Sequence, residues 1–147
     1  MYKVKATVAD LRAAAGDLSP GDLAEFHCMQ AGRDVVEVLT GAHDETTHAI
    51  KCGALVLAVG GHGNGGIWFV TTNLVTRLTQ ADRFRFYKIL KDHLRSIRRG
   101  LPAGAALTNW VSVENYAHIR LLESLRAKFA EGHTMSPAGF RFRQFWL

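Results

Sequence analysis

The sequence predicts an α+β domain in which helices flank a mixed, mostly antiparallel sheet of about six or seven strands. The segment Leu107–Phe129 changes from an alternating apolar run to a helical period at Glu114-Asn115, which indicates a strand followed by a helix. Three apolar runs between residues 46 and 72 indicate an antiparallel meander. Because 147 residues with 48% hydrophobic side chains suit a single core, we expect one domain over residues 1–147.

The amino-terminal part of the chain is expected to begin with a strand and to continue with helices. Apolar and polar side chains alternate over the first seven residues, which predicts a strand with one solvated face. A short helix follows, which Asp10 can cap and Gly16 can end. A second helix starts at Ser19-Pro20, with Asp22 three residues after the serine, and runs towards Gly32. Residues 34–39 are expected to add a last turn or two.

The glycine-rich segment Gly60–Gly66, GGHGNGG, lies between two of the predicted strands. The three strands of the meander are expected at Thr46–Lys51, Ala54–Val59 and Ile67–Thr72. The segment contains a formal G-x-G-x-x-G match, but dinucleotide binding by that motif requires a helix after the last glycine, and a strand follows here. We therefore expect a flexible hairpin loop, with His62 and Asn64 able to touch a substrate.

Charge is divided unevenly along the chain. Residues 1–73 carry 5 Lys and Arg against 8 Asp and Glu, whereas residues 74–147 carry 13 against 5. Much of the basic excess lies on an amphipathic helix predicted over Ala81–Arg99. Its basic face is expected to be solvated, or to attract the phosphates of a nucleotide cofactor or of nucleic acid. Because the aromatic side chains of this helix fall on its buried face and cannot stack on bases, nucleic acid ranks last among the partners.

Asn115 occupies the point where a strand around Trp110 passes into a helix. Its amide can cap the helix, which is the commoner role, or face a ligand at the carboxyl end of the strand; the sequence leaves both interpretations open. The helical period continues to Phe129. A pair of strands is expected to end the chain, with Phe140 and Phe142 on one face of the last strand and arginines on the other.

The residues themselves indicate neither a metal site nor a membrane segment. Cys28 and Cys52 lack the spacing of metal ligands and are expected to stay reduced. The longest apolar run, Ala54–Val59, is too short to span a bilayer, and the start of the chain lacks the apolar part of a signal peptide. We therefore expect a cytosolic protein without a bound metal.

Two families resemble this chain. The order of elements and the segment VSVENYAHIRLLESLRAKF (Val111–Phe129) resemble the GNAT superfamily of acyl-CoA-dependent N-acyltransferases. A closer resemblance, over about residues 54–147, is to the internal virion protein A family of short-tailed bacteriophages. The residues that carry it are Leu57–Gly61, Trp68–Thr71 and the pattern Asn115-x-x-His118-Ile119-Arg120-x-Leu122.

The GNAT resemblance implies direct acyl transfer from acetyl-CoA or another acyl-CoA to an amine. In that superfamily the backbone of the fourth strand binds the pantetheine arm, and the following turn and helix hold the pyrophosphate. The implied cofactor contacts here are Phe69, Val70 and Thr71 on the strand and Asn115 across the cleft. His118 and Glu114 flank Asn115, and either could accept a proton from the amine. A surface position for Glu114 and a core-edge position for His118 are the commoner alternatives.

The chain departs from the GNAT pattern at three functional positions. Acetyltransferases of the superfamily carry Arg/Gln-x-x-Gly-x-Gly/Ala after the fourth strand, because glycine lets backbone N–H groups approach the phosphates, but Thr71–Leu78 contains no glycine. Leu122 stands where the superfamily often has a tyrosine acid, and Arg126 replaces a glycine at the helix end. Arg77 and the start of the helix capped by Thr79 are the remaining candidates for contact with an anion.

These observations support three functional hypotheses. The protein is a phage-encoded acyltransferase that acts on an amine of a host protein or small molecule, or it is a non-catalytic protein that keeps the fold. In the second case it would modulate a host bacterial enzyme or bind other phage proteins in the virion. Nucleic-acid binding is the third hypothesis. The expected location is the host cell cytoplasm or the virion.

Overall fold

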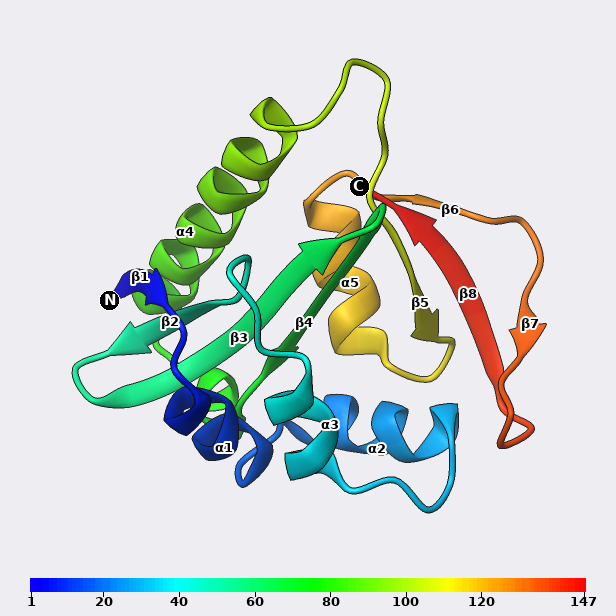
Figure 1. The fold of residues 1–147 in the computed structure, drawn as a ribbon, viewed down its shortest axis with the longest axis horizontal. Coiled ribbons are helices and arrows are strands. Elements are labelled where there is room, and N and C mark those ends of the chain that lie inside the picture. The colour runs from blue at the N-terminus through cyan, green and yellow to red at the C-terminus, as the bar shows by residue number, and fades with distance from the viewer.

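The computed structural model describes residues 1–147 and contains one eight-stranded sheet between two layers of helices (Figure 1). The strands are β1 (Tyr2–Lys5), β2 (His48–Cys52), β3 (Leu55–Gly63), β4 (Gly66–Thr71), β5 (Thr108–Ser112), β6 (Lys128–Phe129), β7 (Thr134–Met135) and β8 (Arg141–Trp146). The helices are α1 (Val8–Ala15), α2 (Pro20–Met29), α3 (Val35–Gly41), the 3₁₀ turn η1 (Asn73–Arg77), α4 (Gln80–Arg99) and α5 (Tyr116–Ser124). The predicted α+β class is confirmed, with one strand more than expected.

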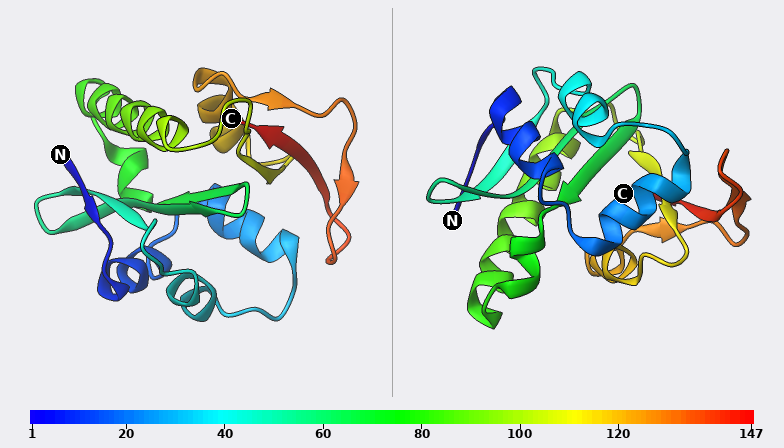
Figure 2. Two further views of the ribbon diagram at one scale, coloured as in Figure 1. Left: turned by 45° about the horizontal axis from the view of Figure 1, so that its top comes forward. Right: turned by 90° about the horizontal axis from the view of Figure 1, so that it is seen from below.

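The sheet is antiparallel except at one pair of strands. Its order is β1-β2-β3-β4-β5-β8-β6, with β7 paired to β8 beside that path. Helices α4 and α5 cover one face, and α1, α2 and α3 lie on the other (Figure 2). β4 and β5 run parallel and share a single register position, Gly66 with Thr108, beyond which they diverge (Figure 1). The opening between them, which we call the split, widens towards the carboxyl ends of both strands.

Apolar side chains fill both faces of the sheet. One cluster lies under α4 and α5 and includes Leu94, Leu107, Leu122 and Phe145. A second cluster lies under α1 and α3 and includes Leu11, Leu39 and Val59. Burial of these side chains on either side fixes the two halves of the sheet, although the halves share few hydrogen bonds across the split.

The amino-terminal helices differ from expectation at two points. Thr7, and not Asp10, is the N-cap of α1, because Asp10 lies at the third helical position and completes a capping box with the Thr7 backbone. Residues 35–41 form a separate helix, α3, capped by Asp34, instead of extending the second helix. The predicted start of α2 at Ser19-Pro20 is confirmed.

The glycine-rich segment forms the predicted hairpin, but its loop is shorter than expected because the strands continue into it. β3 continues through Gly63, and only Asn64 and Gly65 form the turn, with φ of 50° and 76°. Two consecutive left-handed residues make the tight turn that joins twisted strands best. Gly60 is required by close approach, because a Cβ there would lie 2.6 Å from the Trp68 carbonyl oxygen.

Two expectations for the carboxyl-terminal third are corrected. Helix α5 ends at Ser124, and Phe129 belongs to strand β6. Phe140 does not share the buried face of Phe142, because it lies in the turn before β8 and is half exposed. The basic helix is confirmed as α4, with Thr79 as its N-cap, but the expectation that its aromatic side chains are buried is wrong for Phe84, which is 68% exposed. None of the helices combines the length and the apolar character needed to cross a membrane.

Arg126 ends α5 in a left-handed conformation, with φ of 65°. The Ala127 N–H donates to the Leu122 carbonyl and the Arg126 N–H donates to the Glu123 carbonyl, which is the Schellman arrangement. Glycine is the usual residue at this position because it has no Cβ to strain.

Arg126→Gly should therefore raise the free energy of unfolding by about 0.5–1 kcal/mol. Glycine removes the strain of the left-handed conformation, but it also increases the entropy of the unfolded chain, which offsets part of the gain. Chemical denaturation measures it. Arg120→Gly, at an exposed position inside α5, is the control and should lower stability by about 1 kcal/mol. Destabilisation by both changes would contradict the expected strain at Arg126.

Candidate functional site

The split between β4 and β5 is bridged by the protein's own groups. Three alternate N–H groups of β5 are all bonded: Thr108 donates to the Gly65 carbonyl (2.9 Å), Trp110 to Asn109 Oδ1 (2.8 Å) and Ser112 to Glu25 Oε2 (2.9 Å). The Asn109 amide then crosses to β4, where Nδ2 donates to the Ile67 carbonyl at 2.7 Å. One side chain thus replaces the missing strand-to-strand hydrogen bonds in the middle of the split.

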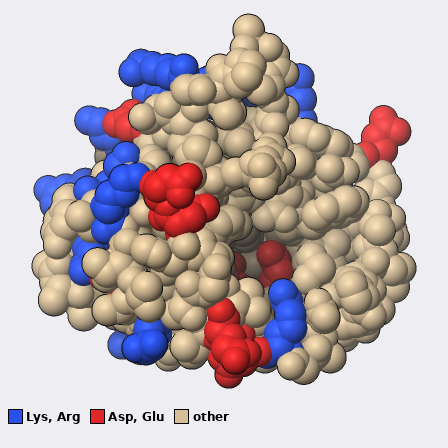
Figure 3. Space-filling view, in the orientation of Figure 1, with Lys and Arg blue, Asp and Glu red and all other residues tan.

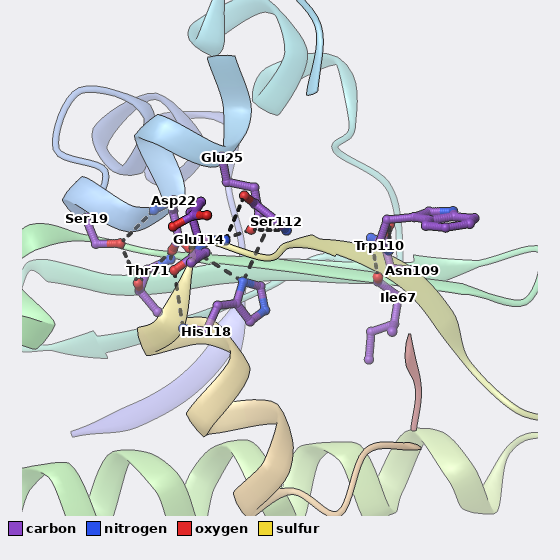
Figure 4. A network of polar contacts seen from close by, with 11 residues as sticks. Ser19, Asp22, Glu25, Ile67, Thr71, Asn109, Trp110, Ser112, Glu114 and His118 are labelled. Carbon is purple, nitrogen blue, oxygen red and sulfur yellow. Dashed lines mark hydrogen bonds and ion pairs between the residues drawn. The ribbon is translucent and has the colours of Figure 1, made fainter. Parts of the chain in front are cut away.

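Helix α2 bridges the wide end of the split (Figure 4). Asp22 Oδ2 accepts the backbone N–H of Thr71 at 2.7 Å and its hydroxyl at 2.8 Å, which ties α2 to β4. Glu25 Oε2 accepts the Ser112 N–H, which ties the same helix to β5. Asn115 Nδ2 donates to both carboxylates, at 3.1 Å to Asp22 Oδ1 and 3.0 Å to Glu25 Oε2. We call Asp22, Glu25 and Asn115 the α2 bridge.

Local sequence places α2 for this role. Ser19 caps the helix, and its N–H also donates to the Thr71 carbonyl at 2.8 Å, so the first turn begins directly on β4. Asp22 and Glu25 stand three residues apart and therefore share one helix face. Gly21 permits the close approach, because a Cβ there would lie 2.5 Å from Asn115 Oδ1.

Burial and partners shift the pKa values of the two carboxyls in opposite directions. Burial alone would raise the pKa of Asp22, but the nearby His118 and the hydrogen bonds from Thr71 outweigh it and lower the pKa from 3.8 to about 2. Burial raises the pKa of Glu25 above 4.5, because its favourable neighbours compensate only in part. The site thus stabilises the ionised form of Asp22 and disfavours that of Glu25, each relative to the same group in water.

The side chain of His118 lies in the split and makes no hydrogen bond. Its Nδ1 is 3.6 Å from Asp22 Oδ1 and 3.9 Å from Glu25 Oε1, and its ring centroid is 4.6 Å from that of Phe69. Neither ring nitrogen has a partner, and the side chain is 10% exposed. The ring fills the space where the diverging strands would otherwise leave a gap.

The sequence left two roles open for Asn115, a helix cap or a ligand contact, and the structure shows the helix cap. Its Oδ1 accepts the His118 N–H at 3.3 Å and caps α5, while its amide holds the α2 bridge. The residue is 4% exposed. All these contacts lie within the protein, so the Asn115 side chain caps α5 and links it to α2.

The predicted site residues converge in part, because Phe69, Thr71, Asn115 and His118 line one small cleft of about 100 Å³ beside Asp22, whereas Glu114 and Arg77 lie outside it. Phe69 and Thr71 face the split, whereas Val70 packs with the cluster under α1 and α3. Glu114 is exposed and accepts the Tyr116 hydroxyl at 3.0 Å, and Arg77 is exposed at the end of η1. Sequence reasoning missed Asp22, Glu25, Asn109 and Ser112 as members of the site. Only the i,i+3 spacing of Asp22 and Glu25 on one helix face could have indicated two of them.

A cleft opens beside the bridge on the α2 side, and we call it the α2 cleft. Its volume is about 260 Å³. Asp22, Glu25 and His118 contribute the polar floor, and its walls include Phe26, Met29, Trp68, Trp110 and Phe142. Figure 3 shows a hollow near the centre of this face with acidic atoms inside it.

The residues present do not fit the acyl-CoA that the fold implies. Both backbone groups of Thr71 on β4 are occupied by α2, through Asp22 and the Ser19 N–H. At the phosphate position, the first turn of α4 already has Thr79 as its cap and carries the carboxylate of Asp82, which would repel a pyrophosphate. Arg83 is turned back onto the Leu78 and Thr76 carbonyls. The structure also contains no cluster of side chains suited to a metal ion.

The fold is that of the GNAT acetyltransferases, as comparison with solved structures shows. The Escherichia coli ribosomal-protein-S18-alanine N-acetyltransferase has a TM-score of 0.62 at 16% identity, covering 99% of this chain and 92% of that one. The protein yncA of Salmonella typhimurium, solved with its cofactor acetyl-CoA, has a TM-score of 0.58 at 14% identity (99% and 91% covered). AAC(6')-Ib with ribostamycin and coenzyme A has 0.59 at 16% (97% and 90%). At these identities the likeness establishes the fold.

Sequence comparison assigns the chain to a phage family. Residues 46–134 match the family described as bacteriophage T7, probable scaffold protein Gp13, and the chain belongs to that family. The probable scaffold protein gp13 of Escherichia phage T7 is 35% identical over 78 residues, which are 53% of this chain and 54% of that protein. The matched region thus spans about half the length of the relative. The predicted resemblance to a short-tailed phage family on a GNAT fold is confirmed.

Proposed function

We propose that the protein is a non-catalytic phage protein that uses a GNAT fold as a rigid binding scaffold in the virion or during its assembly. The observation that carries the proposal is the α2 bridge, because it ties the two strands together where acyltransferases of this fold bind their cofactor. A site closed by charged hydrogen bonds is well ordered but cannot admit a ligand without losing those bonds. The family description as probable scaffold protein supports a role in assembly.

Acyl transfer to a host amine is the second candidate, and one observation favours it. His118 lies in the split with both ring nitrogens unpartnered, as a base awaiting a substrate would. Against this, Glu114, the other predicted base, is exposed and bonded to Tyr116. Modulation of a host bacterial enzyme is a variant of the binding role.

Calorimetric titration with acetyl-CoA separates the two candidates. We expect no binding heat up to about 1 mM acetyl-CoA, because the α2 bridge closes the cofactor position. Any binding weaker than this corresponds to a free energy of less than about 4 kcal/mol. Saturable binding, together with acetyl transfer to a lysine peptide that His118→Ala abolishes, would replace our proposal with the acyltransferase. An acetyltransferase of the same fold with an intact glycine turn is the positive control.

The assembly role has its own test. Mass spectrometry of purified particles of the encoding phage should detect the chain in a fixed ratio to the other particle proteins. Stoichiometric recovery with one bacterial enzyme, combined with its absence from particles, would instead support the modulation of a host enzyme.

A further inference from the structure

We propose that the α2 cleft holds the guanidinium group of an arginine side chain from a partner protein. The inference rests on the proposed binding function and specifies the chemistry of the partner. It is carried by a free carboxylate oxygen, an unpartnered buried histidine and aromatic walls that meet in one cleft.

Glu25 supplies the free acceptor. Both hydrogen bonds that its carboxylate accepts, from the Ser112 N–H and from Asn115 Nδ2, go to Oε2. His118 Nδ1 lies 3.9 Å from Oε1, which exceeds hydrogen-bond length. Asp22, in contrast, has Thr71 on one oxygen and Asn115 on the other. The floor of the cleft thus presents one negative oxygen that lacks a donor.

His118 adds a second unsatisfied group beside it. The side chain is 10% exposed, and buried polar atoms are nearly always hydrogen-bonded, so two orphan ring nitrogens indicate a missing partner. Guanidinium has five N–H donors in a rigid plane, so one edge can meet Glu25 Oε1 while a face stacks on an aromatic wall, whereas an ammonium is a compact and strongly hydrated charge.

The walls suit the same group. Guanidinium stacks on aromatic rings, and Phe26, Trp68 and Trp110 line the cleft. Arg33 of the chain itself demonstrates the mode, because its guanidinium lies 4.4 Å from the Phe26 ring centroid and its Nη2 donates to the Phe26 carbonyl at 3.1 Å, while its buried Nε has no partner. Arg33 is the only Lys or Arg in the lining and forms an ion pair with neither carboxylate. Glu25 Oε1 therefore stays available to an incoming cation.

An adjoining apolar cleft can take the residues that flank the arginine. It measures about 190 Å³ and shares Met29, Trp110 and Phe142 with the α2 cleft. Met135 lines it as well and is 58% exposed, so the apolar surface continues outward. Aromatic side chains and methionine are enriched at the centres of protein interfaces.

The test uses the full chain, labelled for NMR, and Nα-acetyl-arginine methylamide as the probe. We expect saturable shifts of the Trp110 indole and of the resonances of α2 at neutral pH. The citrulline analogue, which has the same shape without the charge, should bind at least about tenfold more weakly, a difference of about 1.4 kcal/mol. Equal binding of arginine and citrulline, or no saturation by arginine, would overturn the inference.

Two glutamate variants locate the binding. Glu25→Gln should weaken arginine binding about tenfold or more, because the amide oxygen can keep its bonds to Ser112 and Asn115 while an NH₂ group replaces the free Oε1. Glu131→Gln removes an exposed charge outside the cleft and should leave binding unchanged. Equal losses in both variants would show non-specific attraction and contradict the proposed site. If arginine does not bind and coenzyme A does not bind either, only the arginine site is wrong and the proposed non-catalytic function still stands. Binding of coenzyme A would overturn the non-catalytic function itself.

Discussion

Replacing Asp22 with alanine should lower the free energy of unfolding by about 3–5 kcal/mol. The change removes the acceptor of the Thr71 N–H, the Thr71 hydroxyl and the Asn115 amide, all of which remain in the folded interior. A buried donor left without a partner costs about 1–3 kcal/mol, and the Thr71 N–H loses its only acceptor. The Asn115 amide and the Thr71 hydroxyl each lose one of two bonds and keep those to Glu25 and Ser19, which adds a smaller loss. Urea denaturation monitored by tryptophan fluorescence measures the effect.

Asp17→Ala is the matched control for this change. Asp17 lies just before α2, is exposed, and its side chain accepts no hydrogen bond, so stability should stay within about 0.5 kcal/mol of the wild type. Equal effects of the two substitutions would show that the α2 bridge contributes nothing to stability.

The pKa of Asp22 adds a pH dependence to the same experiment. Because the folded pKa of about 2 lies below the ordinary 3.8, its ionised form stabilises the fold above about pH 4, and this stability is lost as the pH falls towards 2. Asp22→Asn should lack this part of the stability curve and should differ least from the wild type at pH 2.

Replacing Gly21 with alanine should lower the free energy of unfolding by about 2–3 kcal/mol. An alanine inside a helix normally stabilises it by about 0.5–1 kcal/mol, so the expected sign is the reverse of helix propensity. The cause is the 2.5 Å contact that the new Cβ would make with Asn115 Oδ1, an atom held by the α5 cap while the same amide binds two carboxylates. Thermal unfolding measures the loss of stability, and the chemical shift of the Asn115 amide reports the displacement of that side chain.

Gly41→Ala in α3 is the control for this prediction. A Cβ there would meet nothing within 4 Å, so stability should stay equal or rise slightly. A stabilising Gly21→Ala substitution would mean that α2 does not approach Asn115 as closely as described.

Local patterns predicted most elements because the relevant physical interactions lie within a few residues. The starts of α2 and α4 follow from Ser19 and Thr79, whose side chains accept N–H groups three residues ahead. The length of the glycine-rich hairpin could not be predicted from local patterns, because the need for glycine at position 60 comes from the close approach of Trp68 on the next strand. The end of α5 could not be predicted from them either, because an arginine adopts the conformation that glycine usually takes.

By itself, the sequence determined that Asn115 stands at a strand-to-helix junction of a GNAT-like domain and that the glycine turn of the cofactor site is absent. Only the tertiary structure decided what the amide does there. Its partners Asp22 and Glu25 lie 93 and 90 residues away in the chain, and no periodicity encodes a contact at that separation. The physical reason is that a buried amide must be satisfied by whatever elements packing brings to it, and here packing brings α2 across the split.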